Sequence, residues 1–481
     1  MIRLIQNELV KIFKKKSLYI AFLLIVIAII FTSCMNRFSS NTNSYAQGYI
    51  SSLEQMLSNL NPDNPSDTST YIELKSELDQ IKLIENYGQD SWQATIISQE
   101  MRDLLMQLNM FQYGAGKDET KYQETKKQYD ALIQKLEQND WHYFATEQRK
   151  EIISQLEEIR RQKQATIDKA QQRELEEKIA SLEVEKQVVD WRLQKNISYA
   201  KGEFNNMLLN YPRYQEDVRK YVNQQDDHQA KVNYQESLEG AKLIEYSIEN
   251  EVNVRKTDDT RGVLLNFIEQ NSIYILILVV MIAGAIISDE FNKGTVKLLL
   301  VRPYQRWKIV LAKFIACLIA MFLSIIALLV VQFITASILF GLESLKTPAV
   351  VYNFTTGKIQ TLPILGYLAL TLLAKLPMLI LVMLIAFMLG GVFNNSALAI
   401  VIAFLGFMSS DMINMMATEY GLEWMKFFIT PNWDLTSYLF GGISQFPYTS
   451  FGFSTIMNLL YLVGMLGFTI YVFQKRNIKN I

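Results

Sequence analysis

The chain has 481 residues, half of which are hydrophobic, and its formal net charge at pH 7 is −1. A charge this close to zero leaves no basic excess for nucleic-acid binding, so we expect no nucleic acid among its partners. The two cysteines, Cys34 and Cys317, both fall in apolar runs, which excludes a disulfide framework. A polar stretch of roughly 36–262 separates a short N-terminal apolar run from a long apolar C-terminal part. This uneven distribution predicts a membrane protein with one large polar insertion.

The first predicted element is an amphipathic helix over 2–13, which we expect to lie on the inner membrane surface. A basic triplet, Lys14 to Lys16, then precedes an apolar run over 17–35. The run is longer than the core of a typical signal peptide and lacks an Ala-x-Ala cleavage site. We therefore interpret it as the first membrane span.

The insertion, 36–265, is predicted to be an extracellular helical domain of the hairpin or coiled-coil type. Apolar residues repeat at helical spacing, as at Leu74, Leu78 and Ile81. In the charged stretch 147–196 the apolar frame slips, which favours helical hairpins over a sustained coiled coil.

No enzyme chemistry is predicted for this chain. Gly114 to Lys117 lacks the glycine spacing and the following Ser or Thr of a phosphate-binding loop. The two histidines, His142 and His228, have no cysteine nearby, so neither a metal site nor a histidine-based catalytic centre is expected.

Six apolar runs are long enough to cross about 30 Å of hydrocarbon. They cover 17–35, 266–288, 309–340, 363–391, 396–416 and 453–473. Lys and Arg concentrate before the first span, between the second and third, and after the sixth. The bias of such residues toward the cytoplasm predicts a multi-pass protein of the cell membrane with both termini inside and the insertion outside. The expected fold class is an all-α membrane protein with about six transmembrane helices and a large helical extracellular insertion between the first and second.

Two charged residues fall inside predicted spans, where an unpaired charge is costly. Lys375 lies in the fourth span and Asp411 in the outer part of the fifth, so they could form an intramembrane pair. The alternative is that Lys375 reaches outward to the membrane surface, or that its span begins later.

The segment between the second and third spans carries a recognisable order of residues. A glutamate is followed after three residues by Gly-Thr, then by leucines, a proline, an arginine and a later lysine. This order resembles the signature of ABC-2-type transporter permeases, as do the opening Asn7 to Lys11 and the six-span count. The resemblance covers 1–35 and 266–481 but not the insertion. The matching residues are Glu290, Gly294, Thr295, Leu299, Pro303, Arg306 and Lys313.

The resemblance implies that 289–308 docks on a separate cytosolic ABC ATPase, present in two copies, which would hold ATP and Mg²⁺. This chain itself would hold no cofactor. A second permease chain, identical or a sister subunit, would complete the path through the bilayer. The residues expected to couple to the ATPase are Glu290, Phe291, Gly294, Thr295, Val296, Lys297, Leu299, Pro303, Arg306 and Lys313.

The segment 417–452 resembles the extracellular re-entrant segment that closes the exit in that family. An interfacial aromatic belt would account for its aromatic residues equally well. The residues of this candidate outer gate are Trp424, Phe427, Phe428, Pro431 and Trp433.

The resemblance implies an exporter of a peptide, lipid-linked or drug-like substrate. One alternative is a non-transporting membrane receptor or scaffold, which would need no ATPase. Another is an ABC assembly that transmits ATP-driven motion to the insertion. In each case an extracellular peptide or protein could bind the insertion.

Overall fold

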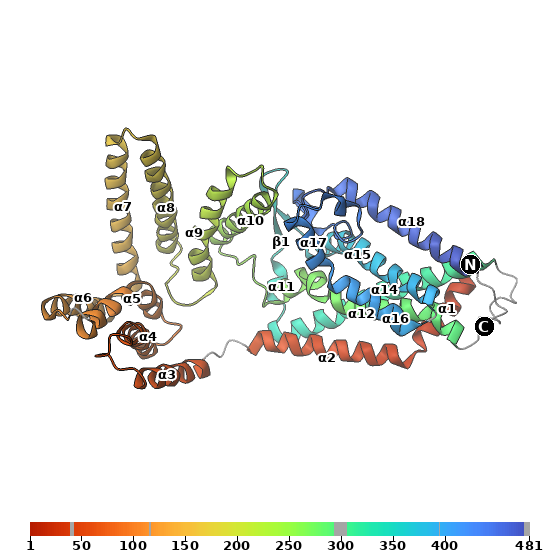
Figure 1. Ribbon diagram of the computed structural model, residues 1–481, viewed down its shortest axis with the longest axis horizontal. Helices are drawn as coiled ribbons and strands as arrows, with labels where there is room; N and C mark the ends of the chain where they lie inside the picture. Colours follow the sequence, from red (N-terminus) through yellow and green to blue (C-terminus); the bar gives the residue numbers. More distant parts are fainter. Residues whose placement is uncertain (39–42, 115–116, 293–304, 394, 476–481) are drawn as a thin grey trace. The chain divides into compact units, whose positions relative to one another are not determined.

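The computed structural model describes residues 1–38, 43–114, 117–292, 305–393 and 395–475 (Figure 1). The chain divides into two compact units. The first, called the membrane unit here, comprises 1–38, 225–235 and 254–481. The second, called the insertion unit, comprises 39–224 and 236–253.

Long apolar helices dominate the membrane unit. Its long and medium helices are α1 (Ile2–Phe13), α2 (Lys16–Phe38), α12 (Phe267–Asn292), α14 (Arg306–Phe340), α15 (Ile364–Phe393), α16 (Ser396–Met408), α17 (Ser410–Glu419) and α18 (Phe451–Lys475). Short elements join them: α11 (Thr260–Leu265), η1 (Glu343–Lys346), η2 (Glu423–Phe427) and η3 (Thr436–Gly441).

Helices α12 and α15 pack along each other and form the centre of the membrane unit. Gly390 of α15 allows their close approach, because a Cβ atom at this position would lie 2.5 Å from the carbonyl oxygen of Gly284 in α12. Small residues at such contacts are typical of helices that associate within a bilayer.

Within the part of the chain that the structure describes, five helices are long and apolar enough to span a membrane, and a bent pair gives a sixth if it counts as one span. The five are Lys16–Met35, Phe267–Phe291, Arg306–Phe340, Ile364–Phe393 and Phe451–Lys475. The prediction of an all-α membrane protein with about six spans is confirmed at this level. The predicted span 396–416 is not one straight helix, however, since α16 and α17 meet at an angle of 41°.

Serine hydroxyls account for the bend between α16 and α17. Ser409 donates to the carbonyl oxygen of Leu405 at 2.8 Å, and Ser410 donates to that of Phe407 at 2.7 Å. A hydroxyl bound to a backbone carbonyl one turn earlier competes with the helix's own hydrogen bonds and favours bending.

A β-hairpin in the loop between α14 and α15 was not predicted. Strands β1 (Ala349–Asn353) and β2 (Lys358–Leu362) pair antiparallel, with Ala349 opposite Leu362. Its turn is closed by the side chain of Asn353, which accepts hydrogen bonds from the backbone amides of Thr355 and Thr356. The Val-Val-Tyr run of β1 has the β-branched and aromatic residues that favour strands.

Basic residues gather at one end of the membrane unit. Lys15, before α2, pairs with Asp289 near the end of α12 at 2.7 Å. Arg306, at the start of α14, donates to the carbonyl oxygen of Gln474 near the end of α18 at 2.8 Å. The described members of the three basic groups that predicted the orientation therefore share one end of the helix bundle (Figure 1).

The regular secondary structure described for the insertion unit is all helical, with turns between the helices. Its helices are α3 (Asn43–Ser58), α4 (Thr68–Tyr87), α5 (Trp92–Tyr113), α6 (Glu119–Gln138), α7 (Trp141–Ala165), α8 (Lys169–Gln194), α9 (Glu203–Val222) and most of α10 (His228–Asn250). Helices α7 and α8 form the hairpin expected within 147–196, with its turn at 166–168. The aspartate before α8, Asp168, caps that helix by accepting from the amide of Ala170.

A buried arginine at the end of α8 fixes the turn into α9. Arg192, only 2% exposed, donates to the carbonyl oxygens of Ile197 and Ser198 and to the side chain of Asn205. Its guanidinium also lies 3.7 Å from the centre of the Tyr199 ring. Burial lowers the pKa of Arg192 to about 10, so the group remains charged at neutral pH.

We expect Arg192→Lys to loosen this turn, because an ammonium cannot reproduce the planar set of donors. The expected loss is about 2 kcal/mol, the scale of charged hydrogen bonds. Hydrogen exchange of the full chain should show faster exchange over 192–205. Arg160→Lys, whose pair with Glu183 is about half exposed, is the control and should leave exchange unchanged. Equal exchange in both variants would contradict this role of Arg192.

Candidate functional site

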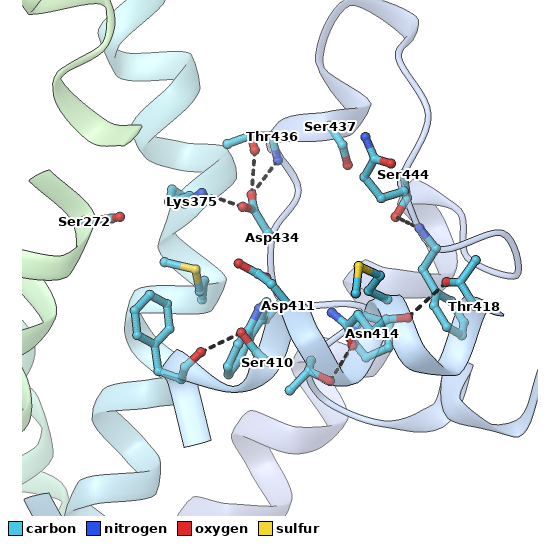
Figure 2. A pocket seen from close by; sticks show the side chains of 18 of the residues that line it. Ser272, Lys375, Ser410, Asp411, Asn414, Thr418, Asp434, Thr436, Ser437 and Ser444 are labelled. Atoms are coloured by element: carbon cyan, nitrogen blue, oxygen red, sulfur yellow. Dashed lines mark hydrogen bonds and ion pairs between the residues drawn. The ribbon is translucent and has the colours of Figure 1, made fainter. Parts of the chain in front are cut away.

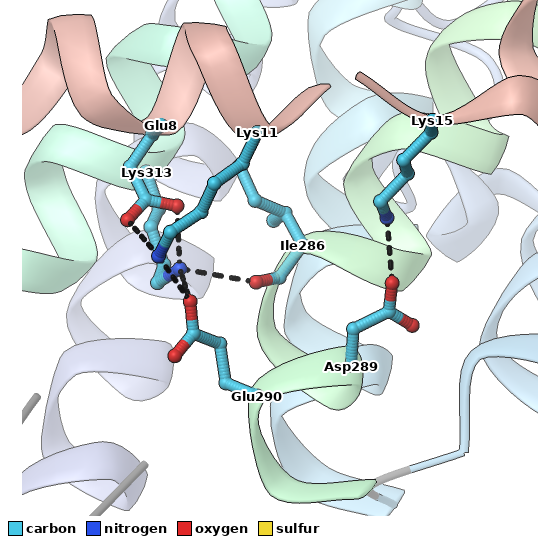
Figure 3. Close-up of polar contacts among 7 residues, drawn as sticks. All are labelled: Glu8, Lys11, Lys15, Ile286, Asp289, Glu290 and Lys313. Carbon is cyan, nitrogen blue, oxygen red and sulfur yellow. Dashed lines mark hydrogen bonds and ion pairs between the residues drawn. The ribbon is translucent and has the colours of Figure 1, made fainter. Parts of the chain in front are cut away.

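Three helices of the membrane unit meet at a cluster of four charged side chains (Figure 3). Lys313 of α14 donates to Glu8 of α1 at 2.7 Å and to Glu290 of α12 at 3.1 Å. Lys11 of α1 donates to the same two carboxylates, at 2.9 Å to Glu8 and 2.6 Å to Glu290. Lys313 also donates to the carbonyl oxygen of Ile286 at 3.1 Å. We call Glu8, Lys11, Glu290 and Lys313 the charge cluster.

The charge cluster is buried and formally neutral. Lys313 is 1% exposed, Glu8 5% and Glu290 7%, whereas the side chain of Lys11 is half exposed. Two carboxylates and two ammonium groups balance, which lowers the cost of burying each charge. Burial alone would lower the pKa of Lys11, but its hydrogen bonds to Glu290 and Glu8 outweigh that effect and raise it. Lys11 therefore stays protonated in the cluster.

The amphipathic pattern of α1 brings Glu8 into this position. Leu4, Glu8 and Ile12 are the buried residues of α1 and follow one another at a spacing of four. That spacing places them on one face of the helix. A glutamate on the buried face needs a buried partner, which Lys313 supplies. This placement of Glu8 is the signal by which its contact could have been found in the sequence.

The structure brings together two of the residues predicted to couple to an ATPase, Glu290 and Lys313. Phe291 is also buried, with its ring against that of Phe473, and Arg306 joins α14 to α18 as described above. The sequence had indicated Glu8 and Lys11 only as part of an opening motif, without their partners. The other predicted coupling residues lie outside the described residues: Gly294, Thr295, Val296, Lys297, Leu299 and Pro303.

A second feature lies toward the other end of α12 and is a cavity of about 1130 Å³ (Figure 2). Its lining comes from α12, α15, α16, α17 and the segment 417–452, with two residues from 227–229. Among the lining residues are the predicted pair, Lys375 and Asp411, and two of the predicted gate residues, Pro431 and Trp433.

Lys375 pairs with two carboxylates, neither of which belongs to Asp411. Its ammonium lies 2.5 Å from Asp434 and 3.0 Å from Glu269. The predicted Lys375–Asp411 pair is thus replaced by Lys375–Asp434 and Lys375–Glu269, because 417–452 folds back onto α15. The amide of Leu435 donates to the carbonyl oxygen of Ala374, which anchors that return.

Asp434 is held in place by its own neighbour. Its second carboxylate oxygen accepts from the amide of Thr436 at 3.0 Å and from the hydroxyl of Thr436 at 2.6 Å. The side chain of Lys375 is 7% exposed, that of Asp434 33% and that of Glu269 63%. The lysine is therefore buried against α12 and 417–452 and is neutralised there.

The predicted gate residues divide into two groups. Trp433 is 4% exposed and packs against Phe407, and Pro431 is also buried. Trp424, Phe427 and Phe428 are 45–56% exposed. Ring contacts link Trp424 with Phe428, and Phe427 with Phe453 of α18. The described residues thus place part of the set in the wall of the cavity and part on the surface.

Asn432 was missed by the sequence analysis and fixes 417–452 in place. It is fully buried, and its side chain donates to the carbonyl oxygens of Lys426 and Phe428 at 2.6 and 2.7 Å. Ser454 and Asn458 of α18 donate to its side-chain and backbone oxygens, both at 2.8 Å. No pattern in the sequence distinguishes Asn432 from other asparagines in loops.

Comparisons with known proteins relate the C-terminal half of the chain to proteins of unknown role. A family model described as "Protein of unknown function (DUF2705)" matches residues 242–479. The chain is 27% identical over 259 residues to "Uncharacterized protein YhcI" of Bacillus subtilis (strain 168), covering 53% of this chain and 80% of that protein. It is 26% identical over 229 residues to "Uncharacterized membrane protein YdbK" of the same organism, covering 46% of this chain and 85% of that protein. No solved structure matches the chain significantly.

The apolar helices and the membrane-protein relative together support a membrane location for this chain. Among the described residues, no group of three or more His, Cys, Asp and Glu side chains is arranged to hold a metal ion.

Proposed function

We propose that this chain is the membrane-spanning permease subunit of an ABC transporter of the ABC-2 type, driven by a separate cytosolic ATPase. A second permease chain completes the assembly, and the substrate moves outward. The observation that carries the proposal is the charge cluster. It joins the opening motif, through Glu8 and Lys11, to Glu290 and Lys313 near the two ends of the signature-like segment.

This arrangement suits the transmission of a force. Residues 293–304 belong to the connection between α12 and α14. Helix α12 ends two residues after Glu290, and α14 begins seven residues before Lys313. A movement of that segment would be transmitted to α1, α12 and α14 together, since the buried charges bind all three helices. Separating those charges would leave them unpaired in a low-dielectric environment, which is unfavourable.

Helix α12 also connects the charge cluster with the cavity. It carries Glu290 in the charge cluster and Glu269 in the ion pair with Lys375. These two residues are 21 positions apart, which corresponds to roughly 30 Å at about 1.5 Å per residue, about the thickness of the hydrocarbon core. One rigid helix therefore links the end that receives the ATPase with the end that faces outward.

The proposal is tested by purifying the full chain through a C-terminal tag from its native membrane and identifying its partners by mass spectrometry. We expect an ABC ATPase in near-equal amount. Lys297→Glu, in the predicted docking segment, should reduce its recovery several-fold. Lys346→Glu reverses the same charge at an 81% exposed site in η1 and is the matched control. No ATPase in the unsubstituted sample, under conditions that preserve other transporters, would favour a receptor or scaffold instead.

A further inference from the structure

The cavity beside Lys375 has the size and lining of a ligand site that none of the comparisons assigns. Its volume of about 1130 Å³ lies just above the usual range for small-molecule sites, roughly 300–1,000 Å³. The lining combines charged groups, hydroxyls, amides and apolar side chains. The apolar and aromatic members are Met378, Phe407, Met415, Pro431, Trp433 and Phe446.

The charges that line the cavity are unequal in number. Among the described residues that line it, five carry carboxylates and one, Lys375, carries an ammonium group, so their summed formal charge is −4. Lys375 is already held between Asp434 and Glu269 and is not available to an anionic ligand. The carboxylates are those of Asp227, Glu269, Asp411, Glu419 and Asp434.

Asp411 and Glu419, both of α17, form no ion pair with any residue that the structure describes. Of the other three carboxylates, two pair with Lys375, and that of Asp227 accepts from the amide of Gln229 at 3.2 Å. Asp411 and Glu419 lie eight residues apart, with Met415 midway, so the spacing of four places all three on one helical face. All three line the cavity. Helix α17 thus presents a thioether between two free carboxylates.

Aromatic side chains supply the complementary apolar surface. Trp433 is 4% exposed and Phe446 3%, so both are fixed in the wall. A ligand with a delocalised or quaternary positive charge and aromatic or alkyl substituents would satisfy both kinds of lining.

We propose that this cavity binds amphipathic organic cations, with Asp411 and Glu419 balancing the positive charge and Trp433 and Phe446 contacting the apolar part. Cation binding in the cavity does not depend on the proposed function. The further step, that such cations are the exported substrate class, rests on the proposed function.

The test measures binding to the purified full chain in nanodiscs of zwitterionic lipid, with binding to empty nanodiscs subtracted. The probe is methyltriphenylphosphonium. Triphenylphosphine oxide, which has the same three rings but no net charge, is the matched probe. We expect saturable binding of the cation at least tenfold tighter than that of the oxide. Equal binding of the two, or no saturable binding, would overturn the proposal without the need for any variant.

Substitutions then locate the site. Asp411→Asn/Glu419→Gln removes both free carboxylates and should weaken cation binding by about tenfold or more, given the strength of charge pairing near a protein surface. Glu343→Gln/Glu423→Gln removes two carboxylates of the same unit that lie outside the cavity and should leave binding unchanged. An equal loss in both double variants would overturn the assignment to this cavity. The assay uses no ATPase, so its failure is distinguishable from failure of the co-purification.

Discussion

Lys313→Met is expected to destabilise the membrane unit by about 3–5 kcal/mol, the cost of removing one partner from a buried ion pair. Glu8 and Glu290 would remain buried, and the half-exposed Lys11 would be the remaining cation of the charge cluster. Helix α1 would lose its ion pair with α14. The measurement is the midpoint of thermal unfolding of the detergent-solubilised chain, followed by intrinsic fluorescence.

Two further variants show whether the loss of stability in Lys313→Met comes from the unbalanced charge or from the missing side chain. Lys15→Met removes the Lys15–Asp289 pair, whose partners are both nearly 30% exposed, and should cost less than about 1 kcal/mol. Lys313→Met/Glu8→Gln restores the neutrality of the buried group and should recover much of the loss. If the double variant is no more stable than Lys313→Met, the cluster contributes by packing and not by charge.

Lys375→Met is expected to release the segment 417–452 from α15. Asp434 would lose its buried partner, and the contact of 417–452 with both α12 and α15 would weaken. We expect a loss of about 2–4 kcal/mol in local stability, somewhat below that for Lys313, because Asp434 and Glu269 have more access to water. Hydrogen exchange should accelerate over 425–440, while α14 remains protected.

A double-mutant cycle identifies the partner of Lys375. The coupling energy between Lys375→Met and Asp434→Asn should exceed about 1 kcal/mol, as for charged groups in direct contact. The same cycle with Asp411→Asn should give a coupling near zero. A larger coupling to Asp411 than to Asp434 would restore the pair predicted from the sequence.

Ion pairs join helices of the membrane unit near both ends of α12. At one end the charge cluster joins α1, α12 and α14. At the other, Lys375 joins α15 to α12 and to 417–452. Because α12 belongs to both, a displacement at the charge cluster would reach the cavity through one continuous helix. This links the proposed coupling to the proposed cation site without a further moving part.

The sequence by itself determined the features that depend on local properties. The length and hydropathy of each apolar run predicted the spans, since roughly 20 apolar residues suffice to cross a bilayer whatever their neighbours are. Helical spacing predicted the helices of the insertion, and the slipping frame over 147–196 predicted the α7–α8 hairpin. The amphipathic pattern of 2–13 predicted α1 and contained, in Glu8, an indication of a buried charge.

Only the tertiary structure decided which charges meet. Lys313 and Glu8 are 305 residues apart in the chain, and Lys375 and Asp434 are 59 apart. Span assignments place Lys375 and Asp411 at similar depth, yet they do not show that 417–452 folds back and brings Asp434 closer. The bend at Ser409 and the role of Asn432 were decided in the same way. Hydropathy fixes how deep a residue lies, whereas the packing of distant segments selects the partner that a buried charge or amide must find.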